Sequence, residues 1–102
     1  MTAKLYISCF REMAWDGNNR PVSAPMMPPL SEAYVEITHE SIASDEFPLG
    51  THFVQLKAEA DCAVAFGDEP VADPEYHLID AGERIFYGVR ENTRVAVIEV
   101  VK

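Results

Sequence analysis

Residues 53–101 of the chain, FVQLKAEADCAVAFGDEPVADPEYHLIDAGERIFYGVRENTRVAVIEVV, decide the fold. Within this stretch, apolar side chains alternate with polar or small ones in the segments 53–58, 62–66, 84–89 and 95–101. This period of two, in segments rich in β-branched and aromatic residues, is typical of β-strands with at least one buried face. Glycine, proline and acidic residues separate the segments. The stretch therefore predicts consecutive strands joined by turns and loops, with no helix between them.

The rest of the chain continues the same pattern. Further strands are expected at 4–10, 32–38 and 76–79, with a short strand or irregular edge between 41 and 50. About six to eight strands at short spacing indicate an all-β fold, an antiparallel β-sandwich or barrel of jelly-roll or Greek-key type. The length of 102 residues predicts a single domain over 1–102. The side chains expected to face the core include Leu5, Ile7, Cys9, Ala33, Val35, Ile37, Val54, Leu56, Ala58, Cys62, Val64 and Phe66.

Charge and cysteine content narrow the function classes. The chain has 17 Asp and Glu against 8 Lys and Arg, a net charge of −9. Direct binding to nucleic acid is not expected, because phosphate affinity comes mainly from clustered Lys and Arg. No leader-like or membrane-spanning segment is expected. Cys9 and Cys62 are predicted to be buried, reduced thiols that act as small apolar residues, and the sequence leaves open whether they lie close together.

An arm at about 11–31 differs from the strands. The turn signal Asp16-Gly17-Asn18-Asn19 is followed by Pro21, Pro25, Pro28 and Pro29, a spacing that excludes helix and favours an extended, polyproline-like course. The arm also carries a large apolar load, so we expect it to dock. Two sites are open, the face of its own domain or a neighbouring subunit.

Small apolar residues also occupy outward positions of the segment 62–66. Ala63 and Ala65 stand where a solvated strand normally carries charged or polar side chains, so something is expected to approach closely there. The last segment, 95–101, is apolar on both faces, which predicts a second layer on each side. The residues predicted to form an oligomer interface are Met13, Trp15, Met26, Met27, Leu30, Ala63 and Ala65.

No reactive constellation is predicted from the sequence. His39, His52 and His77 form no His-x-His or His-x-x-x-His pair, so no metal, no cofactor and no catalytic residue is predicted, and the protein is not expected to be an enzyme. A metalloenzyme would need these three histidines to converge. A second alternative is a small carbohydrate- or peptide-binding module that uses surface aromatics. The aromatics considered for it are Trp15, Tyr34, Tyr76 and Tyr87.

Most of the chain, and residues 53–101 most distinctively, resembles a family of small structural proteins of tailed bacteriophages and prophages. The resemblance is carried by an Asp-Cys-x-Val-x-Phe-Gly strand, a loop containing proline, an Ala-Gly turn, a Tyr-Gly-Val strand and a closing Val-Ala-Val-Ile strand. Here these positions are Asp61, Cys62, Val64, Phe66, Gly67, Pro70, Ala81, Gly82, Tyr87, Gly88, Val89, Val95, Ala96, Val97 and Ile98. Pro28-Pro29-Leu30 also fits. The chain departs from the pattern at Glu91-Asn92-Thr93, where the family has a turn with glycine, and at Val71-Ala72, where it has Thr-Ala.

The resemblance implies a virion-associated protein of the head region, such as a decoration, cementing or connector-associated subunit. Its partners would be capsid or other virion proteins. The docking arm and the outward alanines suit self-association in such a role, and a trimer is favoured because cyclic symmetry buries identical arms efficiently. The resemblance places the protein in the bacterial host cytoplasm during assembly and then in the virion. It carries over no catalytic residues.

Overall fold

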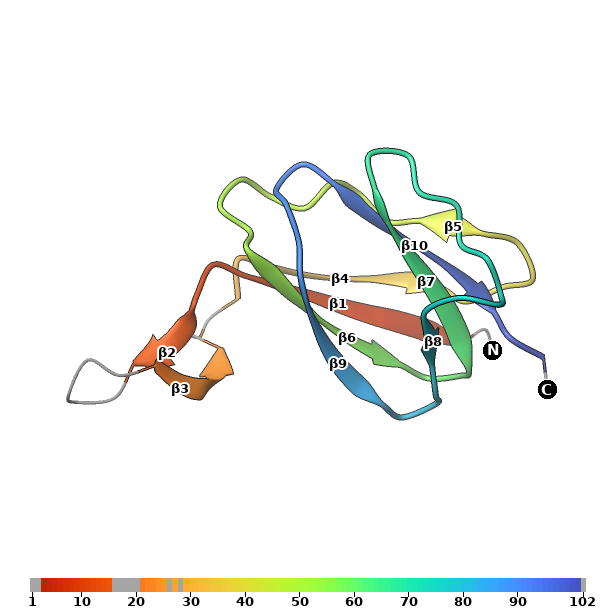
Figure 1. Ribbon diagram of the computed structural model, residues 1–102, viewed down its shortest axis with the longest axis horizontal. Coiled ribbons are helices and arrows are strands. Elements are labelled where there is room, and N and C mark those ends of the chain that lie inside the picture. Colours follow the sequence, from red (N-terminus) through yellow and green to blue (C-terminus); the bar gives the residue numbers. More distant parts are fainter. Residues whose placement is uncertain (1–2, 16–20, 26, 28, 102) are drawn as a thin grey trace.

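The computed structural model describes residues 3–15, 21–25, 27 and 29–101, and it is a sandwich of two antiparallel sheets (Figure 1). The first sheet has the order β4-β1-β6-β9, with β4 Ser31–Glu36, β1 Lys4–Phe10, β6 Phe53–Ala58 and β9 Arg84–Gly88. The second has the order β5-β10-β7-β8, with β5 Ile42–Ala43, β10 Arg94–Glu99, β7 Cys62–Gly67 and β8 Leu78–Ile79. A separate hairpin pairs β2 Met13–Trp15 with β3 Pro21–Pro25.

The predicted all-β class and antiparallel sandwich are confirmed, because the described residues form these two sheets and no helix. Strands β1 and β6 occupy the ranges that the alternation predicts. Strands β7 and β9 differ from the prediction by one residue at the C-terminal end, and β10 begins one residue and ends two residues earlier than predicted. The jelly-roll or Greek-key assignment stays a prediction. No helix in the described part of the chain is long and apolar enough to span a membrane.

The core lies between the two sheets, and the alternation places its residues. Leu5, Leu56 and Val54 from the first sheet and Val64 and Val97 from the second are almost completely buried. Each apolar side chain removed from water in this way contributes about 1.5–3 kcal/mol relative to an exposed position. The alternation with a period of two therefore explains both why these segments form strands and which of their side chains form the core between the two sheets.

Ala33 is the exception among the predicted core residues, since it is exposed. Strand β5 has only two residues, so it covers little of β4, and a hollow of about 260 Å³ opens at this edge between Ala33 and Phe47. Ala33 lies on the face of β4 that the alternation predicts, but the prediction that it is buried was wrong. The reason is that the second sheet ends before it reaches this position.

The outer face of the second sheet is covered by the chain itself. Ala63 and Ala96 have no exposed surface, yet they do not belong to the main core between the sheets. The segment 68–77 leaves β7, reaches the far edge of the sheet and returns to β8 (Figure 1). At the far edge, the backbone N–H of Ala72 donates to Ser41 Oγ at 2.9 Å, and Ala72 is buried. The second layer predicted on this side is therefore a loop of the same chain.

The arm at 11–31 contains a hairpin, which corrects the predicted polyproline-like course over 21–25. Met13 pairs with Pro25 and Trp15 with Pro21, with a register irregularity between the two pairs. Proline is tolerated here because Pro21 begins the strand and Pro25 ends it, so no central hydrogen bond is lost. The turn signal at 16–19 lies outside the described residues.

The hairpin β2–β3 extends from one end of the sandwich, and the described ends of the chain lie at the opposite end (Figure 1). The molecule is consequently elongated, with extents of 46 × 26 × 24 Å. The described strands of the hairpin thus lie beyond the end of the sandwich and not across one of its faces (Figure 1).

Candidate functional site

The predicted interface residues fall in two separate places. Met27 and Leu30 lie on the segment that leads from the hairpin to β4, and their side chains are 65% and 40% exposed. Ala63 and Ala65 lie on β7, where Ala63 is fully buried beneath the chain's own cover and Ala65 is half-buried. The side chains of Met13 and Trp15, and the whole of Met26, lie outside the described residues.

The root of the hairpin is held by backbone hydrogen bonds to the first sheet. The N–H of Leu30 donates to the carbonyl of Cys9 at 2.7 Å, and the N–H of His52 donates to the carbonyl of Phe10 at 2.9 Å. The His52 ring Nδ1 also lies 2.9 Å from the carbonyl oxygen of Arg11. These contacts hold the segments that flank the hairpin, just before β2 and just before β4, against the first sheet.

The outer face of the first sheet carries a cluster of aromatic side chains that we did not predict as a site. Tyr6 and Tyr34 are opposite one another on β1 and β4, with ring centroids 6.4 Å apart. Further along the same face, the Phe53 ring stacks on the Phe10 ring, with centroids 5.2 Å apart, and contacts the Phe86 ring, with centroids 6.0 Å apart. Tyr34 and Phe86 are 56% and 46% exposed, so aromatic surface is open to solvent on both edge strands of this sheet.

Two cations face each other across this surface. Lys57 on β6 is directly opposite Arg84 on β9, so both side chains lie on the outer face. Together with Tyr6, Ser8 and Gln55 they line a hollow of about 170 Å³. No ion pair joins either cation to a carboxylate within the described part of the chain. Like charges directly opposite on neighbouring strands destabilise a sheet, so this arrangement favours an anion brought from outside.

The aromatics considered for a carbohydrate platform do not share one face. Tyr34 lies on the outer face of the first sheet, but Tyr87 on β9 faces inward and packs against Phe66 with centroids 4.9 Å apart. Tyr76 is exposed on the loop before β8, and the side chain of Trp15 lies outside the described residues. The one signal in the sequence for the observed cluster was the unusually apolar outer phase of residues 4–10.

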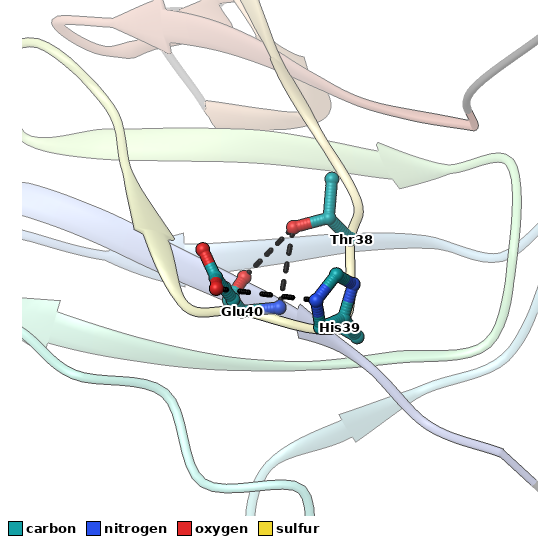
Figure 2. Close-up of polar contacts among 3 residues, drawn as sticks. All are labelled: Thr38, His39 and Glu40. Carbon is teal, nitrogen blue, oxygen red and sulfur yellow. Dashed lines mark hydrogen bonds and ion pairs between the residues drawn. The ribbon is translucent and has the colours of Figure 1, made fainter.

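The histidines lie at separate turns and loop positions. His39 and Glu40 follow β4 in a bend, where Thr38 Oγ1 donates to the carbonyl of Glu40 at 3.0 Å and accepts from its N–H at 3.3 Å (Figure 2). His39 Nε2 lies 3.9 Å from Glu40 Oε1, so the two side chains lie side by side in this bend. Both side chains are strongly exposed. Among the residues described, no group of three or more His, Cys, Asp or Glu side chains is placed to hold a metal ion.

Both cysteines are free and buried, as predicted. Cys9 lies on β1 of the first sheet and Cys62 on β7 of the second. Burial raises the pKa of the Cys62 thiol to about 11, with a further contribution from the negative charge of Asp61, and burial also raises the pKa of Cys9. Because the thiolate is the reactive form, both thiols stay neutral and unreactive near neutral pH.

A scan against protein-family models, a search of curated proteins and a search of solved structures each found no match to this chain.

Proposed function

We propose that this protein is a non-enzymatic structural subunit of a phage or prophage virion, which associates with copies of itself and with a virion lattice. Its place would be that of a decoration, cementing or connector-associated protein, and a cyclic trimer is the favoured form. The resemblance of residues 53–101 supports the phage class. The observation that carries the proposal is the hairpin β2–β3, which extends from the sandwich at the end away from the described chain ends (Figure 1).

An extended hairpin with an apolar sequence supports docking on another subunit. Burial of apolar surface is the main driving force of association, and Met27 and Leu30 remain exposed in the single chain. Backbone hydrogen bonds hold the flanking residues Phe10 and Leu30 on the first sheet, which fixes where the hairpin leaves the sandwich.

The first test is removal of the hairpin. Residues 12–29 are replaced by a short Gly-Asn-Gly turn, which the antiparallel pairing of β1 with β4 allows, since Cys9 and Ser31 are directly opposite. We expect the native chain to form oligomers at micromolar concentration in size-exclusion chromatography with light scattering. The shortened chain is expected to elute as a monomer that keeps its β-sheet circular dichroism.

The matched control is an equally apolar and exposed residue elsewhere. Met27→Ser should lower the fraction of oligomer, whereas Val71→Ser, on the loop across the second sheet, should leave it unchanged. A native chain that stays monomeric at every concentration up to the millimolar range would refute self-association. Capsid, portal or tail genes beside the gene for this chain would test the phage class separately.

A second candidate function is a small binding module for a carbohydrate or peptide. The outer face of the first sheet favours it, because a hollow of about 170 Å³ on this face combines an aromatic ring with polar and cationic groups. Its lining residues are Tyr6, Ser8, Gln55, Lys57 and Arg84. Titration with an acidic oligosaccharide, followed by the amide resonances of β1 and β6, would test it. Shifts confined to these strands would support the module, and an unchanged spectrum would exclude it.

A further inference from the structure

The two sheets differ in the edges that they leave open. The edges of the second sheet are β5 and β8, which have two residues each. The edges of the first sheet are β4 with six residues and β9 with five, and in the described part of the chain neither pairs with a further strand. Short edge strands are poor templates for pairing with another chain, whereas longer ones offer a row of free backbone donors and acceptors. The first sheet therefore has two usable edges, of nearly equal length.

These two edges carry opposite charges on the outer face. Glu32 and Glu36 flank Tyr34 on β4, and Arg84 precedes Phe86 on β9. The Nζ of Lys4, which is opposite Glu36, lies 4.4 Å from the ring centroid of Tyr34, and no ion pair of Glu36 is found among the described residues. One edge thus presents carboxylates, and the other presents a cation that already has the like charge of Lys57 as its neighbour.

One register brings the two edges together in full. If β4 of a second copy runs antiparallel to β9, as in every strand pairing described here, Glu36 can stand opposite Arg84. Phe86 then stands opposite Tyr34, and Gly88 opposite Glu32. On the inner face, Ile85 meets Val35. The opposite charges and the aromatic pair lie on the same face, and such cross-strand pairs are the favourable units of an antiparallel sheet.

We propose that a second copy of this chain adds its β4 to the free β9 edge of the first, in the register Arg84–Glu36, so that the first sheet continues from one subunit into the next. This inference rests on the proposed self-association and adds a second contact to the one made by the hairpin. The carboxylate of Glu36 supplies the partner that Arg84 lacks within the described residues. The contact joins two different edges, so it is head-to-tail and produces a ring where the rotation closes.

Disulfide trapping tests this contact directly. A Tyr34→Cys chain is mixed with a Phe86→Cys chain under mild oxidation, and linked dimers are counted after the remaining thiols are blocked. Directly opposite residues of antiparallel strands lie within the distance that a disulfide spans. We expect efficient cross-linking only in the mixture. Neither variant alone should exceed the background of the native chain, whose two cysteines are buried.

The control mixture pairs Tyr34→Cys with Leu78→Cys. Leu78 is similarly exposed, at 51%, but it lies on β8 of the second sheet. Equal yields from the two mixtures would overturn the edge pairing, because random encounters would then explain both.

Charge reversal provides an independent readout. Arg84→Glu and Glu36→Arg should each weaken self-association by roughly tenfold, since each replaces an attractive cross-strand pair with a repulsive one. The double variant should return to within about threefold of the native affinity. Single variants that associate like the native chain would overturn the inference, as would a double variant no better than either single one.

The outcomes separate this inference from the proposed function. If the native chain associates and loses association with its hairpin, while the reversal variants behave like the native chain, self-association stands and the edge pairing is wrong. If the native chain is monomeric throughout, both are wrong.

Discussion

Asn92 shows how a single residue replaces the expected glycine in the turn between β9 and β10. It has a φ of 62°, in the left-handed region that asparagine tolerates better than most residues. Its N–H donates to the carbonyl of Phe47 at 3.1 Å, and the N–H of Phe47 donates to the carbonyl of Thr93 at 2.8 Å. The turn is therefore tied to the segment before β6. Asn92 thus supplies the left-handed residue of this turn without a glycine.

We expect Asn92→Gly to be tolerated and Asn92→Val to destabilise the protein by about 1–2 kcal/mol, because a β-branched side chain is strained at positive φ. Urea unfolding followed by circular dichroism measures the difference between the two variants. Equal stability of the glycine and valine variants would contradict the strain argument.

At the scale of elements, the cover over the second sheet distinguishes two alanines that face each other. Ala96 on β10 is opposite Ala43 on β5, so both side chains lie on the same face of the sheet. Ala96 is completely buried and Ala43 is exposed. We attribute this difference to the loop at 68–77, whose buried Ala72 is held beside Ser41 at the edge of this sheet.

We therefore expect Ala96→Leu to lower the free energy of unfolding by about 1–3 kcal/mol, the usual cost of overpacking a closed site. Ala43→Leu is the matched control and should change it by less than about 0.5 kcal/mol. Thermal or urea unfolding of the two variants checks this. A mild effect at Ala96 would show that the loop gives way and does not form a closely packed layer.

The hairpin is the element for which local reasoning failed. Its prolines indicated an extended chain correctly, but an isolated extended segment and one strand of a hairpin have similar backbone dihedrals. The difference lies in the hydrogen bonds to β2, which no proline spacing encodes. The same holds for its direction, since apolar side chains indicate that a segment docks but not on which surface.

At the scale of the whole molecule, net charge opposes association. Two copies that each carry −9 repel one another over a distance set by the ionic strength. In the inferred register Arg84 and Glu36 are directly opposite, so dissolved salt screens their attraction less than it screens the repulsion between the two net charges. We expect the mean oligomer mass, measured by light scattering at fixed protein concentration, to rise as NaCl increases from about 10 to 150 mM. A fall in mass would show that attraction between exposed, opposite charges dominates the interface.

The outer face of the first sheet illustrates what sequence reasoning could and could not find. Each of Tyr6, Tyr34, Lys57 and Arg84 has an outward phase that its own strand's alternation predicts. Their gathering on one surface depends on the order β4-β1-β6-β9 and on the register of each pair.

By itself, the sequence determined the class of fold, the position of most strands and the side chains that turn toward the core. These follow from a period of two, which is a local property of the backbone. Only the tertiary structure decided the order of the strands, the exposure of Ala33, the burial of Ala63 and the outward course of the hairpin. Those features depend on which distant segment lies beside each strand, and many pairings of the same strands would satisfy the local pattern equally well.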